Sequence, residues 1–125
     1  MRKLIISGIL TLIILSGCSS EASVTTDEKV TSLISDYLGA LESKDISAMA
    51  KYTDDLRFPD KDEQKKQYSN IKAEITDTKI IEIKKVSETE FEATVEMVSD
   101  GDLNEFIFPI QKQKEDWEII VGQDF

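Results

Sequence analysis

The apolar residues of this chain change their spacing once along the sequence, and this change restricts the fold more than any other feature. Up to about residue 71 the apolar side chains recur three or four positions apart, as they do on one face of a helix. From Ile75 onward they alternate with polar side chains, as they do along a strand covered on one face. Helices followed by strands predict an α+β domain in which the helices cover one face of an antiparallel sheet.

The helical part is predicted to contain two helices and a third, very polar one. Thr25-Thr26-Asp27-Glu28 has the form of a capping box, which predicts a helix over 26–43. Asp45 can cap a second helix that ends at about Tyr52. The third helix is predicted over 62–71. The apolar face of the first helix is formed by Val30, Leu33, Ile34, Tyr37, Leu38 and Leu41.

Four strands are predicted, at about 75–86, 90–99, 103–113 and 117–121, with turns between them that are short enough for hairpins. One turn contains Asp100-Gly101, a dipeptide that supplies the positive φ a hairpin turn needs. The strand side chains expected to face the helices are Phe91, Ala93, Val95, Met97, Phe106, Phe108 and Ile110. None of them is ionisable, so the sheet offers no general base to an enclosed substrate.

The amino terminus predicts export and attachment to a membrane. A positive start, Met1-Arg2-Lys3, precedes an apolar stretch over 4–15. As a helix this stretch rises about 18 Å, less than the ~30 Å hydrocarbon core, so it indicates a signal peptide and not a spanning helix. Leu15-Ser16-Gly17-Cys18 follows and resembles the lipobox of bacterial lipoproteins. The alternative is an ordinary signal peptide with an incidental cysteine.

The resemblance to lipoproteins implies a division of the chain. Residues 1–17 would be a signal peptide that is cut between Gly17 and Cys18, and the sulfur of Cys18 would carry a diacylglyceryl group. Residues 18–25 would form the lipidated amino terminus and a short tether, and residues 26–125 a single α+β domain. We therefore expect a protein anchored by lipid to the extracytoplasmic face of the cell membrane, in a Gram-positive-type envelope.

Charge and composition exclude several classes of function. Fifteen Lys and Arg stand against twenty-five Asp and Glu, and loss of Arg2 and Lys3 with the signal peptide lowers the net charge from −10 to −12. Nucleic acid binding requires cations that neutralise phosphates, so no nucleic acid partner is expected. The chain has no histidine, which removes the commonest general base and metal ligand together. The single cysteine permits no intramolecular disulfide.

Two segments resemble the opening of nuclear transport factor 2-like domains: Tyr37-Leu38-Gly39-Ala40-Leu41-Glu42 and Asp45-Ile46-Ser47-Ala48-Met49. A closing strand that carries Trp117 after a charged turn is similar too. The resemblance implies that helices pack on a curved, antiparallel, four-stranded meander to form a cone with a pocket, as in cystatin-like folds. The pocket residues it suggests are Tyr37, Tyr52, Asp54, Phe91, Phe106, Phe108 and Trp117.

Chemistry in this pocket is open to two interpretations. A tyrosine with Asp54 can polarise a carbonyl and abstract a proton, as in an isomerase. In the favoured alternative, Tyr37 and Tyr52 are core residues with a hydrated hydroxyl and Asp54-Asp55 is a solvated helix exit. No metal is expected, because aligning Gly101 with the glycine of a calcium loop places Val98 and Ile107 at ligand positions. No cofactor is expected either, since nucleotide-binding loops are missing from the sequence.

These observations favour a membrane-anchored, non-catalytic binding module. Its partner would be another envelope protein or a small apolar ligand. The alternative is a small-molecule carrier or an isomerase-like enzyme that uses the apolar cone.

Overall fold

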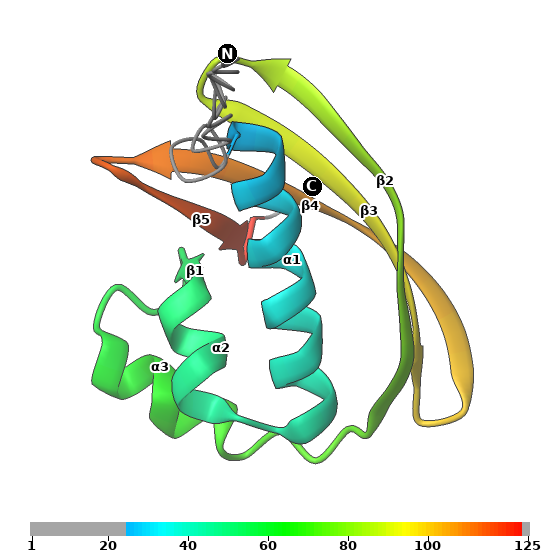
Figure 1. Ribbon diagram of the computed structural model, residues 1–125. Helices are drawn as coiled ribbons and strands as arrows, with labels where there is room; N and C mark the ends of the chain where they lie inside the picture. Colours follow the sequence, from blue (N-terminus) through cyan, green and yellow to red (C-terminus); the bar gives the residue numbers. More distant parts are fainter. Residues whose placement is uncertain (1–24, 124–125) are drawn as a thin grey trace, which may run out of the picture.

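The computed structural model describes residues 25–123, which form three helices and a sheet of five strands. The sheet has the order β1-β5-β4-β3-β2, with β1 parallel to β5 and every other pair antiparallel. In Figure 1 the sheet curves around α1, while α2 and α3 lie at the end of the sheet where β1 pairs with β5. The elements are α1 (Thr26–Ser43), α2 (Ile46–Tyr52), β1 (Thr53–Asp55), α3 (Lys61–Tyr68), β2 (Ile75–Ser87), β3 (Glu90–Ser99), β4 (Asp102–Gln113) and β5 (Asp116–Val121).

The first two helices begin and end where the sequence predicts. The hydroxyl of Thr25 accepts a hydrogen bond of 3.2 Å from the backbone N–H of Glu28 at the start of α1. Lys44 ends this helix in the left-handed conformation, with φ 57°. Asp45 then caps α2 by accepting from the backbone N–H of Ala48 at 3.2 Å. These caps fix where the two helices begin through contacts between residues that are close in the sequence.

The core lies between α1 and the concave face of the sheet. The helix contributes its predicted apolar face, and every second residue of β3 points toward it because side chains alternate along a strand. Full burial of a valine, isoleucine or phenylalanine side chain stabilises the fold by about 1.5–3 kcal/mol. The most deeply buried apolar residues are Val30, Ile34, Phe91, Ala93, Val95, Ile110 and Ile119.

Irregular pairing of β2 with β3 gives the sheet its curvature. The register shifts at three places along β2, the first between Thr76 and Lys79. At this first shift Asp77 has a φ of 51°. Such bulges bend a strand and increase its twist. At the β3–β4 turn Asp100 and Gly101 both have positive φ, 50° and 88°, so the predicted hairpin is confirmed there.

The expectation of four strands is wrong in one respect, because the sheet has a fifth strand, β1. Thr53, Asp54 and Asp55 pair in parallel with Ile119, Ile120 and Val121, so Asp54-Asp55 is not a solvated helix exit. Asp55 is only 1% exposed. A three-residue polar strand has too little alternation to be predicted, and its pairing depends on β5, which lies more than sixty residues away in the chain.

The third helix is shorter than predicted. It spans Lys61–Tyr68, begins at Asp60, whose carboxylate accepts from the N–H of Asp62 at 2.9 Å, and leaves Ile71 beyond its end and 52% exposed. Across residues 25–123, none of the helices is both long enough and apolar enough to cross a membrane.

Candidate functional site

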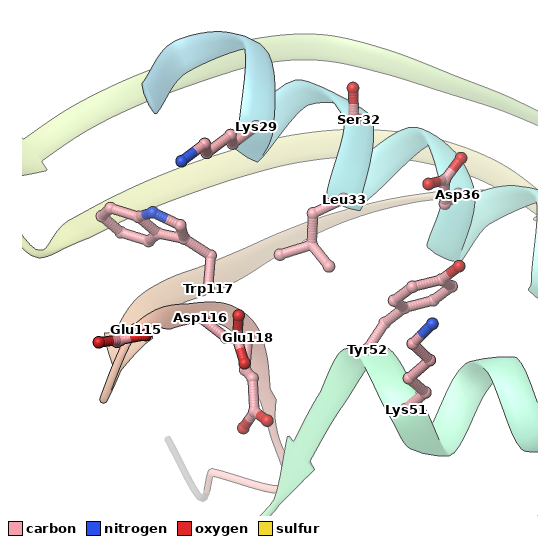
Figure 2. A pocket seen from close by; sticks show the side chains of 10 residues that line it. All are labelled: Lys29, Ser32, Leu33, Asp36, Lys51, Tyr52, Glu115, Asp116, Trp117 and Glu118. Atoms are coloured by element: carbon pink, nitrogen blue, oxygen red, sulfur yellow. The ribbon is translucent and has the colours of Figure 1, made fainter. Parts of the chain in front are cut away.

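An open groove lies between α1, the end of α2 and the start of β5. Its volume is about 510 Å³, within the range of ~300–1,000 Å³ that is usual for ligand pockets. Figure 2 shows Leu33 between the two walls, with Trp117 on one side and Tyr52 on the other. We call it the Trp117 groove. It is lined by Lys29, Ser32, Leu33, Asp36, Lys51, Tyr52, Glu115, Asp116, Trp117 and Glu118.

The two aromatic walls of the Trp117 groove are fixed by neighbouring side chains. The indole of Trp117 packs edge-on against the buried ring of Phe91, with ring centroids 5.3 Å apart. Tyr52 is the last residue of α2, and the ammonium of Lys51 lies 5.7 Å from the centroid of its ring. Both Trp117 and Tyr52 are only half-buried. The groove therefore exposes part of two aromatic rings to solvent, each in contact with a neighbouring side chain.

Charge in the Trp117 groove is unbalanced toward carboxylates. Four carboxylates and two ammonium groups line it, and no ion pair within 4 Å joins any two of them among the described residues. Partial burial raises the pKa of Glu118 above its ordinary value. The carboxylates of Asp54 and Asp116 add to this rise, while Lys61 opposes it. Burial is thus the main cause of the raised pKa of Glu118, and charges of both signs surround its carboxylate.

A second polar cluster lies around Asp55, whose side chain is fully buried. The carboxylate of Asp55 accepts hydrogen bonds from Nε of Arg57 at 2.9 Å, from Nη2 of Arg57 at 2.7 Å and from the hydroxyl of Tyr68 at 2.6 Å. Burial alone would raise the pKa of Asp55, but these hydrogen bonds outweigh it and hold the pKa below its ordinary value. We call Asp55, Arg57 and Tyr68 the Asp55 network. Its carboxylate is anionic and fully engaged.

Gln64, Thr53 and Lys61 extend this polar region toward α2. The amide nitrogen of Gln64 donates to the hydroxyl of Thr53 at 2.7 Å, and that hydroxyl donates to the carbonyl of Met49 at 2.8 Å. Lys61 donates to the carbonyls of Ala50 and Thr53 near the end of α2, where a cation is favoured. The amide oxygen of Gln64 is buried and has no hydrogen-bond partner among residues 25–123.

Tyrosine hydroxyls inside the cone are held in the neutral form. Burial raises the pKa of Tyr37 well above its ordinary range, and the nearby Tyr68 and Asp55 raise it further. The pKa of Tyr68 is raised by burial and by its hydrogen bond to Asp55. Neither phenol is poised to act as a base near neutral pH, and Asp55, with its lowered pKa, is a weak base.

Comparison with known proteins supports an assignment of the fold alone. No protein-family model matches the sequence, and no curated protein matches it significantly. A ketosteroid isomerase-like protein from Erwinia carotovora atroseptica superimposes with a TM-score of 0.54 at 16% identity, covering 76% of this chain and 92% of that one. The chain has the nuclear transport factor 2-like fold.

Two further structures superimpose with lower TM-scores. An NTF2-like protein of unknown function from Shewanella oneidensis has a TM-score of 0.48 at 14% identity, covering 77% of this chain and 96% of that one. Another from Cytophaga hutchinsonii has a TM-score of 0.49 at 11% identity, covering 80% and 90%.

The nuclear transport factor 2-like fold separates the residues that the sequence suggested for one pocket. Tyr37 and Phe91 are buried in the core, and Tyr37 packs edge-on against Phe108 at 5.8 Å. Tyr52 and Trp117 line the Trp117 groove instead.

The remaining suggested residues lie elsewhere. Asp54 accepts a hydrogen bond of 2.8 Å from the side-chain amide of Gln113. Phe106 is expected inside the cone, yet it is 40% exposed, because β5 pairs only with the last four residues of β4 and leaves the earlier part of β4 at an edge. Phe106 and Phe108 border a smaller depression of about 160 Å³. Gly17 and Cys18 lie outside the described residues.

Sequence reasoning missed the Asp55 network and the acidic side of the Trp117 groove. Arg57 and Tyr68 stand two and thirteen residues after Asp55, with no periodic pattern that would bring them together. Asp116 and Glu118 alternate with Trp117 on β5. A polar–aromatic–polar strand end of this kind is the one available signal that points to a groove there.

Proposed function

We propose that this protein is a lipid-anchored, non-catalytic binding module of the cell envelope and that it binds its partner in the Trp117 groove. The observation that carries the proposal is the contrast between two regions. In the Asp55 network, the charged and phenolic groups of Asp55, Arg57 and Tyr68 are hydrogen-bonded to one another. In the Trp117 groove, aromatic and acidic side chains face open space. The side chains of the Trp117 groove are therefore free to contact a partner, whereas those of the Asp55 network are already hydrogen-bonded to one another.

The position of the groove agrees with a membrane tether. Lys29 and Ser32 belong to the first two turns of α1, so the Trp117 groove reaches the end of the domain that the tether would join. Seven residues between Cys18 and the first helix extend at most about 25 Å. A lipid on Cys18 would thus hold the groove close to the membrane surface, where a partner in the same membrane can reach it.

Position-specific photo-cross-linking in living cells tests the proposal. A photoreactive amino acid at Ser32, which lines the Trp117 groove, is expected to give a discrete adduct with an envelope component. The control places the same amino acid at Glu105, an exposed residue of β4 outside the groove. Exporting residues 19–125 behind a signal peptide without a lipobox, which removes the anchor, is expected to abolish the Ser32 adduct. Equal adducts at Ser32 and Glu105, or none at Ser32, would contradict the proposal.

An isomerase-like enzyme is the second candidate, and one observation favours it. Tyr68 and Asp55 meet inside the cone at 2.6 Å, a pairing of phenol and carboxylate that can polarise a carbonyl. Against it, the lowered pKa of Asp55 makes the carboxylate a weak base, and Asp55 lines neither the Trp117 groove nor the depression beside Phe106 and Phe108. Turnover of an enolisable ketone that is lost in Asp55→Asn with the fold intact would favour the enzyme.

A further inference from the structure

The charge and shape of the Trp117 groove define the chemistry of what binds there. The groove combines a floor of aliphatic carbon at Leu33 with the exposed faces of Trp117 and Tyr52. An aliphatic stem gains by lying on such surface, and a cation gains by lying over an aromatic face within about 6 Å of its centroid. Side chains with both parts are those of lysine and arginine.

The groove already holds a cation on an aromatic face in this way. The ammonium of Lys51 lies 5.7 Å from the ring centroid of Tyr52. Figure 2 shows the side chain of Lys29 extending from α1 toward the indole of Trp117. The walls of the groove are therefore compatible with ammonium groups. The negative charge nevertheless exceeds the positive, since four carboxylates line the groove beside these two lysines.

The surplus negative charge lies on β5. Asp116 and Glu118 flank Trp117, and neither carboxylate has an ion-pair partner within 4 Å in residues 25–123. Burial is the main cause of the raised pKa of Glu118; Lys61 opposes the rise, and the carboxylates of Asp54 and Asp116 add to it by disfavouring the charge of Glu118. A cation placed beside Glu118 would relieve this repulsion, whereas an anionic ligand would increase it. The net charge of −12 over residues 18–125 also attracts a basic partner over longer distances.

The length of the groove favours a chain segment over a compact amine. Its α1 wall runs from Lys29 to Asp36, eight residues whose seven steps span about 10 Å of helix axis. An extended polypeptide rises about 3.3 Å per residue, so about three residues of a partner chain fit along this wall.

We infer that the Trp117 groove receives a lysine or arginine side chain from an extended basic segment of a partner protein, with the stem on Trp117 and Leu33 and the cationic group beside Asp116 and Glu118. This inference rests on the proposed function and names the partner's chemistry.

Fluorescence of the mature, lipidated protein in detergent tests the inference directly. Trp117 is the only tryptophan of the chain, so its emission reports on the groove alone. The first probe is the peptide acetyl-Gly-Arg-Gly-Arg-Gly-amide. The second replaces both arginines with citrulline, which keeps the shape and removes the charge. The third is agmatine, a free amine with the arginine guanidinium. We expect saturable binding of the arginine peptide, at least tenfold weaker binding of the citrulline peptide, and weaker binding of agmatine.

Matched variants separate local from overall charge. Asp116→Asn with Glu118→Gln removes two charges from the groove and is expected to weaken binding of the arginine peptide at least tenfold. Glu96→Gln with Glu105→Gln removes two charges from directly opposed positions of β3 and β4 and is expected to change binding less than twofold. Circular dichroism checks that both double variants fold.

Several results would overturn the inference. They are no saturable binding of the arginine peptide, equal binding of its citrulline analogue, equal weakening in both double variants, or agmatine binding as tightly as the peptide. If any of these occurs while photo-cross-links at Ser32 persist, the basic segment is wrong and the binding groove stands. If the cross-links are absent as well, the proposed function falls with it.

Discussion

The hydroxyl of Tyr68 donates a hydrogen bond of 2.6 Å to Oδ2 of Asp55, and the same oxygen accepts from Nη2 of Arg57 at 2.7 Å. Tyr68 is the last residue of α3 and Asp55 the last of β1, so this contact joins the outermost helix to the edge strand of the sheet. The side chain of Asp55 is fully buried, while that of Arg57 is 57% exposed. A buried carboxylate is tolerated here because its oxygens are hydrogen-bonded and one partner is a cation.

Stability should decline in acid because of Asp55. Its folded-state pKa is held below the unfolded value of about 3.9, since the hydrogen bonds of Arg57 and Tyr68 outweigh the effect of burial. The resulting stabilisation is complete above the unfolded pKa and is lost as pH falls through the folded pKa. Urea unfolding between pH 7 and pH 3 should show this loss. Asp55→Asn should lower the free energy of unfolding at pH 7 by about 1.5–3 kcal/mol. It should also reduce the fall of this free energy between pH 7 and pH 3, which we call the acid limb.

Asp54→Asn is the control for this measurement. Asp54 is half-buried and accepts one hydrogen bond from Gln113, which asparagine can still accept through its amide oxygen. We expect its acid limb to keep the shape of the wild type. An unaltered acid limb in Asp55→Asn would contradict the assignment of the transition to Asp55.

Tyr68→Phe tests the hydrogen bond by itself. Phenylalanine keeps the ring and removes the donor, so a buried charged acceptor loses one partner, at a cost of about 1.5–3 kcal/mol. Tyr52→Phe removes the same atom from a half-buried ring and should change the free energy of unfolding by less than about 0.5 kcal/mol. Similar losses in both variants would show that Tyr68 contributes through packing and not through Asp55.

Maturation of the precursor should depend on Cys18. Only a thiol at this position can form the thioether that precedes cleavage, so Cys18→Ser should leave residues 1–17 attached. Intact-mass measurement of the protein from membranes, with metabolic labelling by a fatty acid, detects both events. A Cys18→Ser protein that is still cut before residue 18 would contradict the lipoprotein assignment. Ser19→Ala, one residue further along, is expected to mature normally.

Helix caps and apolar spacing predict most of the fold. Contacts between residues that are distant in the sequence do not follow from these patterns. The capping residues Thr25 and Asp45 fix where two helices begin, because each signal is contained within four residues. The alternation of Phe91, Ala93 and Val95 likewise predicts which face of β3 is buried, since it depends only on strand geometry.

β1 and the Asp55 network depend on other parts of the chain. Thr53 forms a strand only because Ile119 offers it a free edge, and Asp55 is buried only because Arg57 and Tyr68 satisfy it. A run of polar residues taken alone indicates a solvated surface, so the sequence pointed away from both features. The Trp117 groove was half predicted. The sequence predicts Tyr52 and Trp117 as pocket residues, but it does not predict that Asp116 and Glu118 line the same groove.

Two glycines should respond to alanine with opposite signs. Gly122 has a φ of +80°, and a Cβ there would lie 2.7 Å from Oδ1 of Asp55 and 3.0 Å from two atoms of Arg57. Gly122→Ala should therefore lose about 1–2 kcal/mol from backbone strain, with a further loss from displacing the Asp55 network. Gly39 lies exposed within α1, where an added Cβ would meet nothing within 4 Å, so Gly39→Ala should gain about 0.5–1 kcal/mol. Chemical denaturation of both variants measures the difference. If Gly122→Ala were as stable as the wild type, the packing of β5's end against Asp55 would be wrong, and with it the explanation of why that carboxylate stays buried.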